Sequence, residues 1–227
     1  MTGQELNSAA LPKGPHSLTR EEVLASQRAR LLTATLNAVG QCGYATLKVE
    51  RITSEAHVSR TAFYEQFTNK EDAFLQAYDS FGEAFLAQLI EVSSLASHPL
   101  AAVESSTKLL VGWLTERPLA ARAWLLEIYA LGDRGLDRRA STMRAVEEAF
   151  GLAARWIRRL DPELSAVRPL VARGVVAASF ELLSEAVRDP TPQQIAEATT
   201  AISDLWIMGM TSMPYEPGSS PKLTRDG

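Results

Sequence analysis

Residues 52–71 read ITSEAHVSRTAFYEQFTNKE, and the spacing of the apolar residues changes in the middle of this stretch. Ile52 and Ala56 lie four residues apart on one helical face, and Phe63 and Phe67 repeat this spacing on a second. Ser59 stands between the two periods, where its hydroxyl can accept a backbone N–H that the first turn of a helix leaves unpaired. The stretch therefore predicts two short helices joined by a tight turn, a helix-turn-helix.

The second of these helices has an outward face that suits duplex DNA. With both phenylalanines assigned to the core, Arg60, Thr61 and Tyr64 face outward, and side chains of these types contact phosphates and base edges in a major groove. Glu65 is expected to stay solvated or paired within the protein. The full set of expected DNA-contacting residues is Thr46, Lys48, Ser59, Arg60, Thr61, Ala62, Tyr64, Gln66 and Lys70.

This part of the chain resembles the N-terminal DNA-binding domain of TetR-family transcriptional regulators. The resemblance covers about residues 20–80. Leu47 stands where the family usually has a capping threonine, which Thr46 could replace, and Thr53 replaces an alanine. His57 replaces the usual glycine of the turn, at a cost of about 1 kcal/mol or more. The motifs that carry the resemblance are Gly43-Tyr44, Val58-Ser59-Arg60, Phe63-Tyr64, Phe67 and Lys70-Glu71.

The composition is that of a soluble globular protein, with 46% hydrophobic and 22% charged residues. The net charge of −4 is unevenly spread. Residues 17–70 contain seven Lys or Arg against five Glu, whereas residues 71–227 contain fifteen basic and twenty-one acidic residues. A mildly basic head on an acidic body fits a DNA-binding protein that makes few, placed contacts.

Several other classes of protein find little support in the sequence. A single cysteine, Cys42, excludes an internal disulfide, and the three histidines are far apart, so we expect no metal and no cofactor. No phosphate-binding glycine loop follows a strand, so an enzyme is not expected. No apolar run reaches the ~20 residues that span a bilayer, so we expect a cytoplasmic protein without membrane contact.

The helical periodicity continues to the end of the chain and predicts an all-α fold of about nine helices. We expect a flexible leader over residues 1–17, a helix-turn-helix domain over 18–69, an effector-binding and dimerisation domain over 70–212, and a flexible tail over 213–227. A capping pattern at Thr19 starts the first helix and Gly43 stops it. The later helices are expected at about 68–96, 100–116, 118–131, a stretch ending at 160, 167–188 and 191–209.

The last two helices are expected to form a dimer interface. The helix over 167–188 has two apolar stripes, and one of them is left over once the other packs on the core. Two such helices from each subunit make a four-helix interface with two-fold symmetry, an arrangement that the TetR resemblance also implies. The expected interface residues are Val175, Ala178, Leu182, Ala186, Ile195, Ala198, Ile202 and Trp206.

The body is also rich in aromatic residues, which fill a core or line a cavity. The resemblance implies an effector pocket in this part of the chain, and an apolar cavity is the usual form of a small-molecule site. Taken singly, each aromatic residue suits the core at least as well. The candidates for the pocket are Trp113, Trp124, Tyr129, Phe150, Trp156 and Phe180.

Together these patterns predict a transcriptional regulator that binds an inverted-repeat operator in double-stranded DNA as a homodimer. We expect a repressor that a small, largely apolar effector releases from DNA by linkage between the two sites. The alternative is a helical dimeric adaptor or effector-binding protein without DNA-binding activity, which would keep the bundle but show no sequence-dependent retention on DNA.

Overall fold

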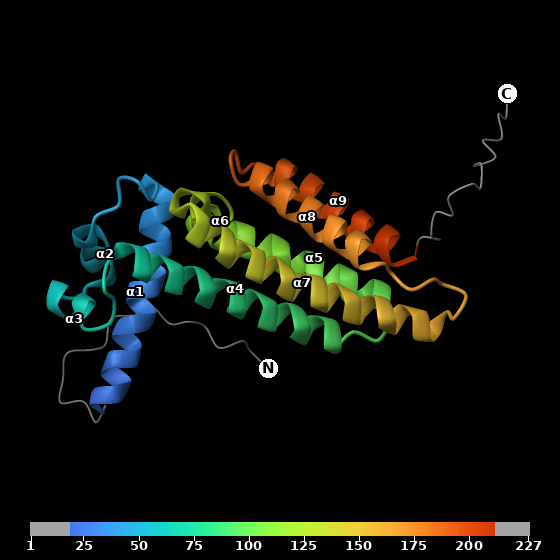
Figure 1. Cartoon of the computed structure of the whole chain (residues 1–227), viewed down its shortest axis with the longest axis horizontal. Helices are drawn as coiled ribbons and strands as arrows, with labels where there is room; N and C mark the ends of the chain where they lie inside the picture. The colour runs from blue at the N-terminus through green and yellow to red at the C-terminus, as the bar shows by residue number, and fades with distance from the viewer. Residues whose placement is uncertain (1–18, 212–227) are drawn as a thin grey trace.

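The computed structural model describes residues 19–211, and the expected leader and tail lie outside them. Every regular element within the described residues is a helix, so the predicted all-α fold is confirmed (Figure 1). Its elements are α1 (Arg20–Cys42), α2 (Val49–Ala56), α3 (Arg60–Tyr64), α4 (Lys70–Ser94), α5 (Pro99–Glu116), α6 (Pro118–Leu126), the 3-10 helix η1 (Glu127–Leu131), α7 (Asp133–Leu160), α8 (Pro169–Ala186) and α9 (Pro192–Thr211).

Local signals set most of the helix ends. Thr19 and Glu22 form the capping box that starts α1, and Gly43 ends this helix with a φ of 75°. Asn69 caps α4 by accepting the Asp72 N–H at 2.9 Å. Each of these caps is local in sequence, so the helix boundaries near them were predictable from the sequence.

The break between the sixth and seventh helices differs from the sequence-based expectation. The expected helix over 118–131 changes to a 3-10 helix at Glu127, and α7 begins directly after Gly132, whose φ is 56°. Gly135 lies inside α7. A Cβ on Gly135 would lie 2.0 Å from the Ile128 carbonyl oxygen, so this glycine serves close packing against η1.

The helices form a small head and a longer bundle (Figure 1). The head consists of α1, α2 and α3, and α4 begins in it and continues along the bundle. Helices α5, α7, α8 and α9 run roughly along the same direction as α4, and α6 lies where the bundle meets α1. Helix α4 therefore belongs to both parts of the molecule.

Two hydrophobic cores correspond to the head and the bundle. The head core gathers apolar residues of α1, α2, α3 and the first turns of α4, and it includes Ala120 and Ala123 of α6. The bundle core starts at Leu75 and Tyr78 of α4 and extends through α9. Because α4 and α6 contribute to both cores, the boundary that we expected at residues 69–70 falls within a shared packing region.

Close contacts fix the head to the bundle. A Cβ on Gly40 of α1 would lie 2.0 Å from the Leu119 carbonyl oxygen, so α1 and α6 touch through their backbones. The Glu127 carboxylate accepts the backbone N–H of Tyr44 at 3.0 Å, which joins η1 to the loop after α1. Two ion pairs, Glu71 with Arg134 and Asp79 with Arg138, join α4 to the start of α7.

No helix between residues 19 and 211 is both long enough and apolar enough to cross a bilayer.

Candidate nucleic-acid interface and cavity

The turn between α2 and α3 has the conformation that the sequence suggested. His57 adopts the left-handed conformation, with φ 53° and ψ 48°. Ser59 caps α3, and its hydroxyl accepts the Ala62 N–H at 3.1 Å. Phe63 and Phe67 are buried, with their ring centroids 5.4 Å apart. The buried pair anchors α3 on the head and fixes which of its faces remains free.

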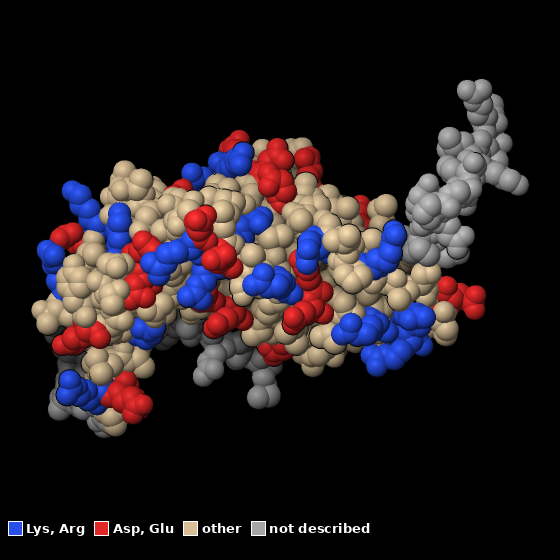
Figure 2. Space-filling view, in the orientation of Figure 1, with Lys and Arg blue, Asp and Glu red and all other residues tan. Residues whose placement is uncertain are grey.

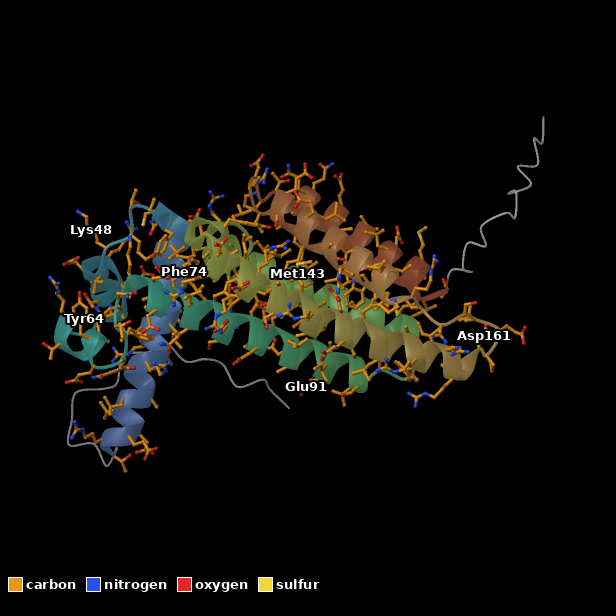
Figure 3. All side chains as sticks on the ribbon, in the orientation of Figure 1. Lys48, Tyr64, Phe74, Glu91, Met143 and Asp161 are labelled. Atoms are coloured by element: carbon orange, nitrogen blue, oxygen red, sulfur yellow. The ribbon has the colours of Figure 1, made fainter. Side chains whose placement is uncertain are left out.

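The free face of α3 presents Arg60, Thr61 and Tyr64 to solvent. Tyr64 exposes 50% of its surface, although its ring also packs edge-on against Phe63. Lys48 and Tyr64 both lie at the outer end of the head, away from the bundle, whereas Phe74 lies where α4 enters the head (Figure 3). The outer end of the head therefore carries side chains suited to duplex DNA.

Arg60 has a partner that sequence analysis did not identify. Its guanidinium forms an ion pair of 2.7 Å with Glu50 of α2, and it lies 5.9 Å from the centroid of the Tyr64 ring. Contact with the Tyr64 phenol and then the charge of Glu50 raise the pKa of Arg60. Arg60 is thus a cation held in place on the surface, and a DNA phosphate or base has to displace Glu50 from it.

The expected DNA contacts at the edge of the helix-turn-helix are only partly free. Lys48 is exposed at the start of α2, and the Thr46 hydroxyl is also exposed but donates to the Cys42 carbonyl at 2.6 Å. Ala62 is half-buried on α3. The Gln66 side-chain nitrogen is buried and has no hydrogen-bond partner within residues 19–211, so it does not reach outward to an adenine as expected.

Lys70 differs most from the expected role. Its ammonium donates to the carbonyl oxygens of Tyr44 at 3.2 Å and Leu47 at 3.0 Å, and it lies 4.6 Å from the centroid of the Tyr44 ring. The side chain therefore ties the α1–α2 loop to the start of α4. The free phosphate-binding lysine that we expected here is replaced by a lysine with partners inside the protein.

Positive charge alone does not mark the outer end of the head. Figure 2 shows blue and red side chains mixed over the head and a denser blue cluster over the C-terminal end of α7, at the far end of the molecule. The last turn of α7 contains Arg158 and Arg159. Any DNA contact at the head therefore depends on a few placed side chains rather than on a broad basic surface.

The bundle encloses a cavity of about 70 Å³ between α4, α5, α6, α7, α8 and α9. Of the six aromatic residues proposed for a pocket, Trp113, Trp124 and Phe180 line it. The other three do not. Tyr129 is 45% exposed on η1, and Phe150 is fully buried in the bundle core. Residues of the lining that sequence analysis did not single out for the pocket are Phe81, Phe85, Leu89, Val103, Ser106, Thr107, Leu110, Leu114, Ala121, Leu125, Val146, Ser179, Leu183, Ile202, Ser203 and Trp206.

Trp156, the last of the proposed pocket residues, is half-buried on α7 and also does not line the cavity. Its aromatic character made it a candidate, and this character does not show at which level along the bundle the cavity lies. Phe81 and Phe85, which do line it, pack against Trp113 with ring centroids 4.5 Å and 5.2 Å away. These two phenylalanines continue the apolar stripe of α4, and that stripe was the signal that could have identified them.

The expected dimer residues fall into two groups. Val175, Ile195 and Ile202 are each 9% exposed or less and belong to the core of their own bundle, and Ala186 is also buried, at 4% exposed. These four are corrected to core residues, because side chains buried in one subunit have little surface left for a partner. The other four, Ala178, Leu182, Ala198 and Trp206, are half-buried.

A strip of half-buried apolar residues runs along the outside of α8 and α9. Trp206 donates to the Ser179 hydroxyl at 3.1 Å, which orients one flank of α9 toward α8, and the Thr107 and Ser203 hydroxyls join its other flank to α5. Helical spacing then places half-buried apolar residues along one side of α8 and along one side of α9. We call this strip the α8–α9 seam: Val171, Ala178, Leu182, Ala198, Ala201 and Leu205.

Helix α3 is capped and exposed on a three-helix head, and this head is joined to a bundle with its own cavity. These features are typical of a helix-turn-helix DNA-binding protein with a separate cavity-bearing domain. The family described as bacterial regulatory proteins, tetR family, matches residues 31–77, which span α2, α3 and parts of α1 and α4. The HTH-type transcriptional regulator RutR of Escherichia coli K12 is 24% identical over 150 residues, 63% of this chain and 70% of RutR. Residues 31–77 therefore form a DNA-binding domain of the TetR type, and the chain is similar to TetR-family transcriptional regulators.

Solved structures share this fold over most of their length. FadR of Bacillus subtilis, solved in complex with stearoyl-CoA, superposes with a TM-score of 0.69 at 14% identity, covering 79% of this chain and 97% of that one. The regulatory protein TetR of Rhodobacter sphaeroides superposes with a TM-score of 0.63 at 22% identity, covering 78% of this chain and 96% of that one. The likeness therefore extends from the head through the bundle.

Proposed function

We propose that this regulator is a repressor that binds an inverted-repeat operator as a homodimer and leaves it when a small, largely apolar ligand enters the bundle cavity. The observation that carries the proposal is the shared position of α4. This helix begins in the head core, and Phe81, Phe85 and Leu89 further along it line the cavity. A change of cavity shape can therefore reach the DNA-binding end through one continuous helix.

Within the proposal, α3 enters the major groove, and Arg60, Thr61 and Tyr64 are its principal contacts. Lys48 lies at the same outer end of the head and is placed for a phosphate (Figure 3). Thr46 and Ala62 remain secondary contacts, because the Thr46 proton is already donated within the protein and Ala62 is half-buried. Few contacts per head favour a protein that needs two heads for tight binding.

The α8–α9 seam supports the proposal that two subunits form a homodimer. It joins half-buried apolar side chains of two neighbouring helices into a strip that stays partly exposed, although Val171, Leu182 and Leu205 also pack against their own bundle core. Met208, which is 63% exposed on α9, extends the strip toward the end of that helix. A self-complementary apolar strip fits a two-fold interface in which the same surface of each subunit meets itself. The two heads then read two half-sites about one helical turn (~34 Å) apart, or somewhat more.

The lining of the cavity supports the proposal that a small, largely apolar effector binds there. Its lining is almost wholly apolar, and neither a lysine, an arginine, a histidine nor a carboxylate lines it. At about 70 Å³ it is far smaller than the ~300–1,000 Å³ of a typical small-molecule site. Either the ligand is small, or side chains such as Trp113 move to admit a larger one, such as the acyl-CoA bound by FadR of Bacillus subtilis. Both routes change the packing of α4.

A mobility-shift and footprinting experiment tests the proposed function. Full-length protein is mixed with the DNA upstream of its own gene and with shuffled DNA of equal length. We expect a specific complex whose footprint covers two inverted half-sites and whose binding weakens when a cavity ligand is added. Equal retention of both DNAs would favour the adaptor alternative. A ligand that binds equally well with and without operator DNA would contradict the linkage.

A further inference from the structure

Three tryptophans line the cavity, and they differ in what their indole N–H groups contact. Trp113 donates to the Gln88 side-chain oxygen at 2.9 Å, and Trp206 donates to the Ser179 hydroxyl at 3.1 Å. The Trp124 N–H is buried, and no acceptor within residues 19–211 lies in hydrogen-bonding range of it. Trp124 itself is only 6% exposed. Buried indole N–H groups usually have a hydrogen-bond acceptor, so we expect an acceptor for the unpaired Trp124 N–H.

The remaining polar side chains of the lining already use their protons. Each is a serine or threonine whose hydroxyl can donate to the carbonyl oxygen four residues earlier in its own helix or, between Thr107 and Ser203, to the other hydroxyl. The donors are Ser106, Thr107, Ser179 and Ser203, with distances of 2.8, 3.0, 2.8 and 2.9 Å. Among the described lining residues, the Trp124 N–H is therefore the donor that a ligand can use.

A glycine on α4 lets this helix pack close to the indole N–H. A Cβ on Gly82 would lie 3.3 Å from the Trp124 indole nitrogen, closer than a side chain normally packs. Gly82 also lines a groove of about 250 Å³ between α4 and α7, and this groove shares Phe85 and Val146 with the cavity. The Trp124 ring lines the cavity while its N–H edge faces Gly82 beside that groove, so a ligand acceptor reaches the N–H when α4 or the indole ring shifts.

We propose that the Trp124 N–H is the recognition group of the cavity and that the effector carries a neutral hydrogen-bond acceptor, a ketone or related carbonyl, on an apolar body. This inference rests on the proposed function, because it takes the cavity as the effector site. A carboxylate is disfavoured, since the lining has no cation to offset the burial of its charge. A pure hydrocarbon fits the apolar walls but leaves the Trp124 N–H unpaired.

Two nearly isosteric probes test the proposal. Acetophenone and α-methylstyrene differ mainly in that the ketone has a carbonyl oxygen where the alkene has a CH₂ group. Their dissociation constants are measured by calorimetry with the full-length wild-type protein and with Trp124→Phe, which keeps an aromatic ring but removes the donor. We expect the preference for the ketone over the alkene to fall at least about fivefold in Trp124→Phe.

Trp206→Phe is the matched control, because it also trims a cavity tryptophan but removes an N–H that is already bonded to Ser179. We expect it to weaken both probes alike and to leave their ratio unchanged. Gly82→Ala provides a second variant that keeps the indole and places a methyl group beside its N–H. It should lower the preference for the ketone even if Trp124→Phe fails to fold.

The outcomes separate this inference from the proposed function. Equal ketone preference in wild type, Gly82→Ala and any folded Trp124→Phe would overturn the inference and leave the cavity as an apolar effector site. Failure of both probes to bind the wild-type protein at millimolar concentration would overturn the inference and also count against the cavity as a site for small apolar ligands.

Discussion

Arg60 and Glu50 form an ion pair on the surface that we propose for DNA, and this pair predicts the effect of a single substitution. Glu50→Gln should raise affinity for the operator about two- to fivefold, because Arg60 no longer has to leave a carboxylate and because a negative charge near the phosphates is removed. Fluorescence anisotropy with labelled operator DNA measures this change.

A double-mutant cycle with Arg60→Ala separates the two causes of that gain. If the release of Arg60 matters, the gain from Glu50→Gln should shrink in the Arg60→Ala background. Glu55→Gln, an exposed change on the same helix, controls for general charge removal. A gain from Glu50→Gln no larger than that from Glu55→Gln would show that the pair does not restrain Arg60.

His57 occupies a left-handed turn at a position where the family usually has glycine, and this gives a prediction about stability. His57→Gly should raise the free energy of unfolding by up to about 1 kcal/mol, because glycine adopts a φ of 53° without steric cost. His57→Val should lower it, because a β-branched side chain tolerates this conformation poorly. Urea denaturation followed by circular dichroism should give the order Gly, His, Val. Equal stability of all three would contradict the strain argument.

Among single residues, the sequence predicted those whose role is local. The Ser59 cap and the His57 turn involve neighbours within a few residues, so pattern and propensity suffice to identify them. The partners of Arg60 and Lys70 lie on other elements, and only the packing of α2 and the α1–α2 loop brings them close. The expected role of Lys70 differs from the structure for this reason.

At the scale of elements, the contact between α1 and α6 gives a second prediction about stability. A Cβ at Gly40 would lie 2.0 Å from a backbone oxygen of α6, and backbone cannot move aside as a flexible side chain can. Gly40→Ala should therefore destabilise the protein by about 1–3 kcal/mol. It should also weaken operator binding, since the α1–α6 contact that positions the head on the bundle is disturbed. Thermal denaturation and anisotropy are the two measurements.

Gly112→Ala is the matched control for Gly40. Gly112 also lies within a helix, α5, but a Cβ there would meet only the Glu116 carboxylate, at an ordinary 3.7 Å. Alanine is the better helix former, so this variant should gain up to about 1 kcal/mol. Similar effects of the two substitutions would show that α1 and α6 can separate without cost.

Helix periodicity explains which elements were predicted and where prediction failed. It identified two apolar sides on α8 and an apolar stripe on α9, but it does not tell which apolar residues face the protein's own core. Val175 and Ile202 were assigned to the partner for this reason, whereas the structure buries them in their own subunit. The same limit applies to Phe150 and Trp156, because a cavity arises from imperfect packing among six helices rather than from any one of them.

At the scale of the whole molecule, the action of the two heads in the proposed dimer depends on the surface that joins the subunits. Each head has few proposed DNA contacts, so one head alone should bind DNA weakly. A substitution in the extension of the α8–α9 seam should therefore lower operator affinity without touching the head. Met208 suits this test because it is 63% exposed and its replacement should not disturb the core.

Met208→Glu should convert the dimer to a monomer at micromolar concentration, because it places two like charges close together across a two-fold interface. Sedimentation velocity measures the change of mass, and anisotropy should show a loss of operator affinity of at least tenfold. Thr200→Glu, an exposed position two turns earlier on α9 and outside the seam, should preserve both properties. If Met208→Glu remains dimeric while Thr200→Glu dissociates, the subunits meet around Thr200 rather than through the seam.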